Sequence, residues 1–151
     1  MNNYVVNKNT VGIIFKNDKS IIYENNGNII ENEYIPNKII KNNCDYYGCS
    51  YDGRKSSARN ILGLTHKLPI IIEDTYNMVF FPIISPRLYN CSWFCLNNII
   101  RCEKFDKYCK IYLNNNESIV INCSYNIFNN QLLRSYQLLS VIKCRKNENF
   151  V

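Results

Sequence analysis

The sequence has few of the features that identify specialised proteins. It contains only five glycines, four prolines and one tryptophan, and it has no glycine-rich phosphate loop and no Gly-x-Ser-x-Gly turn. Its apolar runs are a handful of residues long, as at Met78–Phe81, whereas a helix that crosses a bilayer needs about 20 apolar residues. Residues Met1–Lys8 show no basic stretch followed by an apolar one, which an export signal requires. We therefore predict a cytoplasmic protein that does not bind membranes.

Histidine is the next scarce residue, and its scarcity weighs against catalysis. Because His66 is the only histidine, a conventional triad would need a cysteine, His66 and an acid such as Asp74 or Asp106. Nothing in the spacing of these residues favours that arrangement. We predict that the protein is not an enzyme and needs no cofactor, and that His66 is a hydrogen-bonded structural residue.

Cysteine, in contrast, is plentiful. The eight cysteines include no Cys-x-x-Cys pair, whereas structural zinc sites usually combine two closely spaced pairs of ligands. Without an export signal, disulfides are not expected either. We predict reduced, half-buried cysteines that bind no metal. A zinc or redox sensor is an alternative that rests on the number of cysteines alone.

The overall composition indicates one globular domain. At 151 residues with 46% apolar and 20% charged side chains, the chain can bury a core without disulfides or metals. The formal net charge of +6 permits nucleic-acid binding without requiring it.

The first third of the chain has the pattern of a β-meander. Asn17-Asp18 and Asn26-Gly27 are turn sequences that separate apolar, β-branched runs. Pro36 is expected to end the last of these strands. The strands predicted for the whole chain are Val11–Lys16, Ser20–Glu24, Asn28–Tyr34, Pro69–Glu73, Asn77–Phe81, Ser92–Cys102, Tyr108–Leu113 and Ser118–Asn122.

Two segments have helical periodicity. Asp52 can cap a short helix over Gly53–Leu62 that ends at Gly63. A long helix is predicted over Asn126–Ile142, followed by a short frayed tail at Cys144–Val151. Its apolar stripe consists of Phe128, Leu132, Tyr136, Leu139 and Ile142. The fold class is therefore α+β, a single domain with a mostly antiparallel sheet, a short central helix and a long C-terminal helix.

Several cations gather around the short helix. Arg54, Lys55 and Arg59 lie on it, Lys67 follows it, and Arg87 lies in a loop after Pro86. Arginine and lysine bind phosphates and are attracted to narrow A·T minor grooves. On composition alone, a solvated helix face is the favoured explanation.

Four blocks of sequence resemble the ComK family of competence transcription factors. Cys44–Lys55 is similar to the family block Cys-x-aromatic-aromatic-Gly-x-Ser-Tyr-x-Gly-Arg-Lys, and Thr65–Ile70 to Ser-His-Lys-Pro-Pro-Ile. Phe81–Trp93 contains the Phe-Pro, Ser and Cys-Gly-Trp positions with Ser92 in place of Gly, and Ser124–Arg134 resembles Ser-Tyr-Asn-Ser-Phe-Glu-Asn-Gln-x-x-Arg. The match is strongest over residues 44–142, and the first 43 residues match only in pattern.

This resemblance implies a bacterial DNA-binding transcriptional activator. Members of the family bind AT-rich double-stranded DNA as homo-oligomers, largely through the minor groove, and adaptor proteins deliver them to proteolysis. The implied DNA-binding residues are Arg54, Lys55, Arg59, Lys67, Arg87 and Arg134. We assign groove entry to Arg54 and Arg87 and phosphate contacts to Lys55, Arg59 and Lys67. Arg134 is left between a phosphate contact and an internal salt bridge.

One departure from the family supports a second hypothesis: some members carry a longer C-terminal extension than this chain. A separate departure is that Cys95, Cys102 and Cys109 are not recognised family positions. The alternative function is a short ComK-like interaction module that modulates a full-length relative or an adaptor protein.

Overall fold

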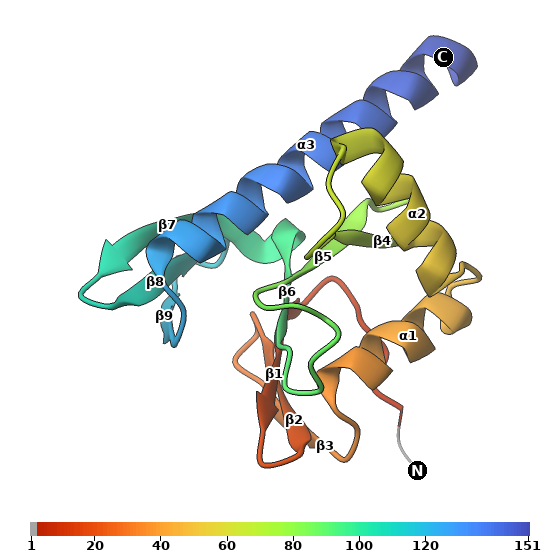
Figure 1. Ribbon diagram of the computed structural model, residues 1–151. Helices are drawn as coiled ribbons and strands as arrows, with labels where there is room; N and C mark the ends of the chain where they lie inside the picture. The colour runs from red at the N-terminus through yellow and green to blue at the C-terminus, as the bar shows by residue number, and fades with distance from the viewer. Residues whose placement is uncertain (1–2) are drawn as a thin grey trace.

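The computed structural model describes residues 3–151, which form three α-helices, one short 3₁₀ turn and nine strands (Figure 1). The helices are α1 (Pro36–Tyr46), α2 (Tyr51–Leu62) and α3 (Tyr125–Phe150), and the 3₁₀ turn is η1 (Leu96–Asn98). The strands are β1 (Thr10–Lys16), β2 (Lys19–Glu24), β3 (Ile29–Asn32), β4 (Ile70–Glu73), β5 (Met78–Pro82), β6 (Trp93–Cys95), β7 (Ile99–Phe105), β8 (Tyr108–Leu113) and β9 (Ser118–Ile121).

The strands form two sheets in which all neighbours are antiparallel. The larger sheet has the order β3-β2-β1-β6-β5-β4 and the smaller one β7-β8-β9. The predicted α+β class with a mostly antiparallel sheet and a long C-terminal helix is confirmed.

The first two hairpins form where the turn sequences predict them. Asn17 and Asp18 both have positive φ, 51° and 62°, as a tight hairpin turn requires. Gly27 has φ of 92° in the next turn, a conformation that side chains disfavour.

The larger sheet is buried on both faces at its centre. On one face, Ile13, Ile72 and Trp93 form a core with Ile39 and Ile40 of α1. The side chains on the other face of the sheet belong to a second core, which α3 and the smaller sheet cover. Its central rings are Phe81, Phe94 and Phe128, whose centroids lie 5.3–6.3 Å apart. Helix α2 packs beside β4 and contacts both other helices, so it lies at the edge where the two cores meet (Figure 1).

Helix α1 was not predicted, because the sequence pattern identifies Pro36 only as the end of a strand. Proline also suits the first turn of a helix, where its missing N–H has no intrahelical partner. The helix buries Ile39, Ile40 and Cys44 at 1% exposure or less. Its buried Asn43 bonds the N-terminal segment, since its Oδ1 accepts from the Val6 N–H at 2.8 Å.

The prediction of one continuous strand over Ser92–Cys102 is wrong. The segment divides into β6, η1 and β7. β6 belongs to the larger sheet and β7 to the smaller one. The division occurs at Asn98, whose Nδ2 donates to the Lys8 and Thr10 carbonyl oxygens at 3.0 and 2.7 Å. These bonds tie the junction between the two sheets to the start of β1.

Both predicted helices exist, with corrected ends. Ser50 rather than Asp52 caps α2, because its Oγ accepts from the Gly53 N–H at 3.1 Å. Gly63 ends α2 as predicted, with φ of 69° and its N–H bonded to the Arg59 carbonyl. The prediction of a frayed tail at Cys144–Val151 is wrong, because α3 continues through Phe150.

The buried stripe of α3 is also rotated from the prediction. The buried residues are Phe128, Gln131, Leu132, Ser135 and Leu138, whereas Tyr136 is 46% exposed. Leu139 and Ile142 are partly buried against the same core.

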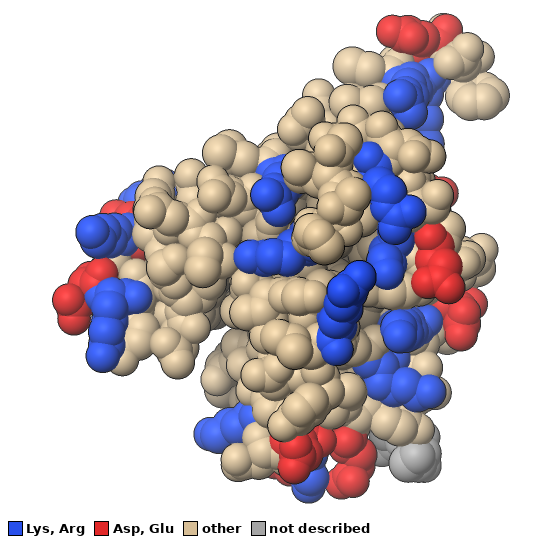
Figure 2. Space-filling view, viewed as in Figure 1, with Lys and Arg blue, Asp and Glu red and all other residues tan. Residues whose placement is uncertain are grey.

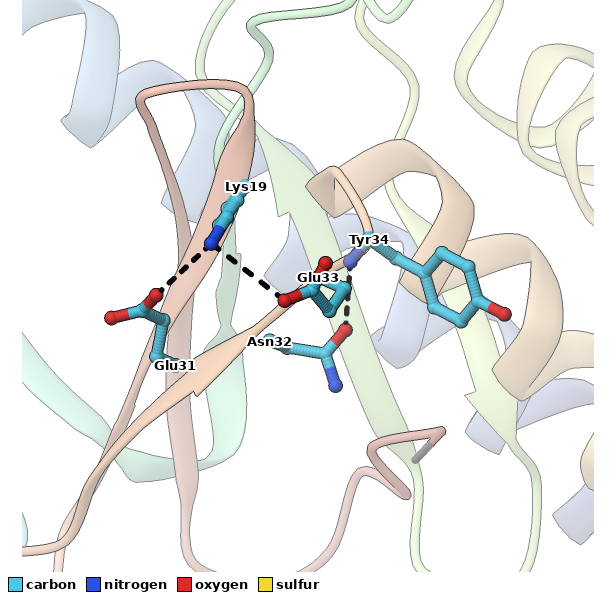
Figure 3. Close-up of polar contacts among 5 residues, drawn as sticks. All are labelled: Lys19, Glu31, Asn32, Glu33 and Tyr34. Atoms are coloured by element: carbon cyan, nitrogen blue, oxygen red, sulfur yellow. Dashed lines mark hydrogen bonds and ion pairs between the residues drawn. The ribbon is translucent and has the colours of Figure 1, made fainter. Parts of the chain in front are cut away.

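At the outer edge of the larger sheet, charged side chains connect β2 to the segment that leads into α1. Lys19 lies between Glu31 and Glu33, with its Nζ 3.4 and 3.6 Å from their carboxylate oxygens (Figure 3). In the same view, Asn32 Oδ1 accepts from the Tyr34 N–H at 3.0 Å. These contacts fix the chain just before α1 begins.

Within residues 3–151, no helix is both long enough and apolar enough to span a membrane. The same residues bring together no group of three histidine, cysteine or acidic side chains that could hold a metal ion. All eight cysteines are free thiols, and four of them are buried. Cys44 and Cys91 pack in the core that contains Trp93, with Tyr47 against it, whereas Tyr46 is 66% exposed.

Candidate functional site

A shallow cleft on one face of the molecule carries most of the predicted cations. We call it the basic cleft: it lies among α1, α2, the segment that follows α2 and the loop that follows β5. Its lining includes five cationic side chains, Lys41, Lys55, Arg59, Lys67 and Arg87, and one carboxylate, that of Asp52. Figure 2 shows Lys and Arg gathered over this part of the surface, with Asp and Glu toward the edges of the view.

Four of the six predicted DNA-binding residues therefore lie together in the basic cleft. They come from α2 and from two loops that are distant in sequence. Lys41 of α1 is an addition that the sequence analysis missed, because it predicted no helix at that position.

The local structure of α2 determines which of its side chains face the cleft. Ala58 is fully buried and so fixes the rotation of the helix about its axis. Lys55 and Arg59 are four positions apart in the sequence and thus lie on the same side of the helix. The Ser50 cap and the Gly63 terminus hold both ends of this helix, so the two cations have a defined position.

An aromatic ring lies among these cations. The Nζ atoms of Lys41 and Lys55 lie 5.3 and 5.5 Å from the centre of the Tyr51 ring, within the range of cation–π attraction. The Tyr51 ring also forms a T-shaped contact with Trp93, with the ring centroids 6.4 Å apart. Burial raises the pKa of Tyr51 to about 12, so its phenol stays neutral and adds no negative charge to the cleft.

The loop that carries Arg87 is held by a side chain of α1. Asn37 Nδ2 donates to the carbonyl oxygens of Pro86 and Leu88 at 3.0 and 3.1 Å. Asn37 Oδ1 in turn accepts from Trp93 Nε1 at 2.8 Å. Arg87 is exposed on a loop whose backbone is fixed on both sides of it.

Arg134 lies in a second cleft beside the first. This Arg134 cleft is lined by residues 64–67 together with Ile127, Asn130, Gln131 and Arg134. Arg134 Nη1 donates to Gln131 Oε1 at 3.0 Å. This partner is a neutral amide rather than a carboxylate, so the contact places no negative charge beside the guanidinium, and the internal salt bridge left open above is not the contact that forms.

Gln131 is the buried residue that organises the second cleft. It is 1% exposed, and its Nε2 donates to the carbonyl oxygens of Lys67 and Pro82 at 2.9 and 2.6 Å. One side chain therefore orients Arg134 and also fixes the backbone at Lys67. Gln131 occupies the Gln position of the family block Ser124–Arg134, but its role was not predicted. Nothing in the sequence pattern distinguished Asn37 from the many other amides of the chain.

Arg54 lines neither cleft. Its Nη2 lies 2.8 Å from Asp74 Oδ1, and its side chain is 27% exposed. Burial lowers the pKa of Arg54, but the hydrogen bond to Asp74 and the charge of that carboxylate outweigh burial, so the pKa is raised. Among the described residues, its buried Nε has no hydrogen-bond partner. The side chain thus connects α2 to the turn between β4 and β5.

His66 differs from its predicted structural role. Its side chain is exposed, it lines both clefts, and no hydrogen bond involves it within the part of the chain that the structure describes.

The size of the basic cleft decides between two kinds of ligand. Its volume is about 210 Å³, whereas pockets for small molecules typically enclose about 300–1,000 Å³. A shallow, cationic surface of this kind fits an extended polyanion that lies across it better than a small molecule enclosed within it.

Comparison with known proteins gives a family and one relative. The model of a family described as ComK protein matches residues 1–147. The chain is 28% identical to the competence transcription factor of Bacillus subtilis (strain 168) over 102 residues, which cover 66% of this chain and 53% of that protein. The chain thus spans about half the length of this relative. No solved structure matches the chain.

Proposed function

The chain belongs to the ComK family, and on this premise we propose that it is a transcriptional activator that binds AT-rich double-stranded DNA through the basic cleft. The observation that carries the proposal is the convergence of five cations and a single carboxylate in that cleft. The name of the similar Bacillus subtilis protein, a competence transcription factor, supports a role in transcription.

The charges of the cleft suit the DNA backbone. Duplex DNA carries one negative charge per about 1.7 Å of its axis, and each phosphate that a protein neutralises releases bound counterions. Lys41, Lys55 and Arg59 come from two neighbouring helices, so their ammonium and guanidinium groups can contact several phosphates of one duplex. Arg87 adds the forked geometry that arginine offers to phosphate oxygens.

Arg54 enters this proposal with a different role from the one predicted. Its ion pair with Asp74 would have to break before the guanidinium could reach into a groove. We assign it the positioning of α2, and we assign the phosphate contacts to Lys41, Lys55 and Arg59. Arg87, for which groove entry was predicted, is likewise assigned a phosphate contact. Lys67, which lines both clefts, and Arg134 of the neighbouring cleft remain in the interface.

The test compares the binding of two duplexes, one AT-rich and one GC-rich, over a series of salt concentrations. For Lys55→Ala we expect weaker binding of both duplexes and a salt slope lower by about one unit, because one phosphate contact is lost. Lys16→Ala is the matched control: Lys16 is exposed and lines neither cleft, so this variant should bind as the wild type does.

The variant with both Lys55→Ala and Arg87→Ala decides the proposal. If it binds the AT-rich duplex as tightly as the wild type at physiological salt, the basic cleft is not the DNA site and the interaction-module hypothesis is better. We also propose that the protein binds as a homo-oligomer. Sedimentation of the same complexes would contradict this part if it finds one chain per duplex at saturation.

A further inference from the structure

The basic cleft and the Arg134 cleft are separated by a single short segment. Thr65, His66 and Lys67 line both of them, so these three residues form the wall between the two depressions. We call this segment the ridge. Thr65 and His66 are exposed, and Lys67 is half-buried.

The ridge is held firmly although it belongs to no helix or strand. Gln131 donates a hydrogen bond to the Lys67 carbonyl oxygen at 2.9 Å. Beyond Lys67, Leu68 is 4% exposed and Pro69 is buried. On the other side, Gly63 ends α2 with its N–H bonded to the Arg59 carbonyl oxygen. Lys67 has φ of 54°, a conformation that is uncommon for a residue with a side chain and that persists only where its surroundings impose it.

Cations lie on both sides of the ridge. Lys55, Arg59 and Arg87 line the cleft on one side, and Arg134 lines the cleft on the other. In the view of Figures 1 and 2, Lys and Arg lie on either side of the segment between α2 and β4.

We infer that the ridge enters the minor groove of AT-rich DNA and that the cations on its two sides contact the phosphates of the two strands. This inference rests on the proposed function, and it assigns base discrimination to Thr65, His66 and Lys67 rather than to Arg54.

The dimensions favour the ridge over α2 as the element that enters the groove. The minor groove is about 6 Å wide and the major groove about 12 Å. A helix with its side chains measures about 10–12 Å across, so it fits only the major groove. A single stretch of chain is narrower, since neighbouring strands in a sheet lie about 4.8 Å apart.

The chemistry of the ridge fits the base edges in this groove. Adenine and thymine present only hydrogen-bond acceptors there, whereas a G·C pair adds the guanine 2-amino group, which is a donor. The hydroxyl of Thr65, an imidazole N–H of His66 and the ammonium of Lys67 can all donate. The ridge therefore matches an A·T pair and meets an unfavourable donor at a G·C pair.

Inosine provides a direct test, because it is guanosine without the 2-amino group. Replacing guanosine by inosine changes the minor groove of a GC-rich duplex and leaves the pattern of donors and acceptors in its major groove unchanged. We expect the wild-type protein to bind the inosine duplex at least about fivefold more tightly than the unmodified GC-rich duplex.

The ridge variants then show which residues sense the difference. For Thr65→Ala and His66→Ala, the gain in affinity on replacing guanosine by inosine should be smaller than for the wild type. The salt slope of these variants should stay as in the wild type. In Lys55→Ala the salt slope should fall and the gain should persist. Thr75→Ala is the matched control, since Thr75 is exposed and lines neither cleft.

The outcomes separate the two proposals. If the Lys55 and Arg87 variants bind every duplex as the wild type does, the proposed function fails. If those variants lose affinity but inosine gives no gain, or if both ridge variants keep the full gain, DNA binds at the basic cleft and the assignment of the ridge is wrong.

Discussion

Arg54 and Asp74 form an ion pair that connects α2, which carries two cations of the basic cleft, to the edge of the larger sheet. The two side chains are 27% and 46% exposed, so solvent screens their attraction. Exposed pairs contribute about 0.2–1 kcal/mol. The pair therefore acts mainly by fixing the position of α2.

A double-mutant cycle measures this contribution. We expect Arg54→Ala and Asp74→Ala each to lower the free energy of unfolding, with a coupling energy between them of about 1 kcal/mol or less. Arg54→Ala should retain the preference for AT-rich over GC-rich DNA. The opposite result, wild-type stability in urea with the preference lost, would show that Arg54 contacts DNA directly.

Individual cations of the site could be predicted from the sequence, but the residues that hold them could not. Charge identifies Lys55, Arg59 and Arg87, and Lys55 also lies in a family block. The roles of Asn37 and Gln131 depend on which carbonyl oxygens tertiary packing brings beside them. Because amides are abundant in this chain, residue type alone does not select these two.

At the scale of elements, α3 shows how much periodicity can predict. Spacings of three and four residues identify the helix, and Phe128 and Leu132 are buried as expected. Hydrophobicity alone would bury Tyr136, yet the neighbouring Ser135 is buried instead. Its hydroxyl donates to the Gln131 carbonyl oxygen at 2.8 Å, so this polar group is satisfied inside the protein.

This rotation of α3 has a measurable consequence. Leu132→Ala and Leu138→Ala remove side chains that are 4% and 2% exposed, and each should lower the free energy of unfolding by about 2–5 kcal/mol. Tyr136→Ala, at a position 46% exposed, should change it by about 0.5 kcal/mol or less. Urea unfolding curves compare the three variants, and a Tyr136 variant as unstable as the leucine variants would contradict the observed orientation.

At the scale of the whole molecule, the sequence pattern did not predict that the strands divide into two sheets. The apolar pattern continues from β6 into β7, so nothing local indicates that the chain leaves one sheet for the other. The change depends on Asn98, whose bonds to the Lys8 and Thr10 carbonyl oxygens join segments about ninety residues apart. Sequence patterns therefore predict the strands, whereas long-range hydrogen bonds determine the sheets to which they belong.

Two thiols in the core that contains Trp93 also make stability depend on pH in the alkaline range. Cys91 and Cys95 are at most 1% exposed, and burial raises the pKa of each thiol to about 12. In the unfolded chain a cysteine has a pKa of about 8.5. The folded protein therefore keeps these protons at pH values at which the unfolded chain has released them.

The sign follows from proton linkage. Where the folded state binds more protons than the unfolded state, the free energy of unfolding falls as pH rises. The contribution of each thiol is complete below about pH 8.5 and is lost between there and about pH 12, at about 1.4 kcal/mol per pH unit at most. We expect the urea midpoint to fall between pH 8 and pH 10, and the variant with Cys91→Ala and Cys95→Ala to lose less stability over that interval than the wild type. Equal losses in the two proteins would show that these buried thiols do not cause the pH dependence, since the remaining titrating groups are the same in both.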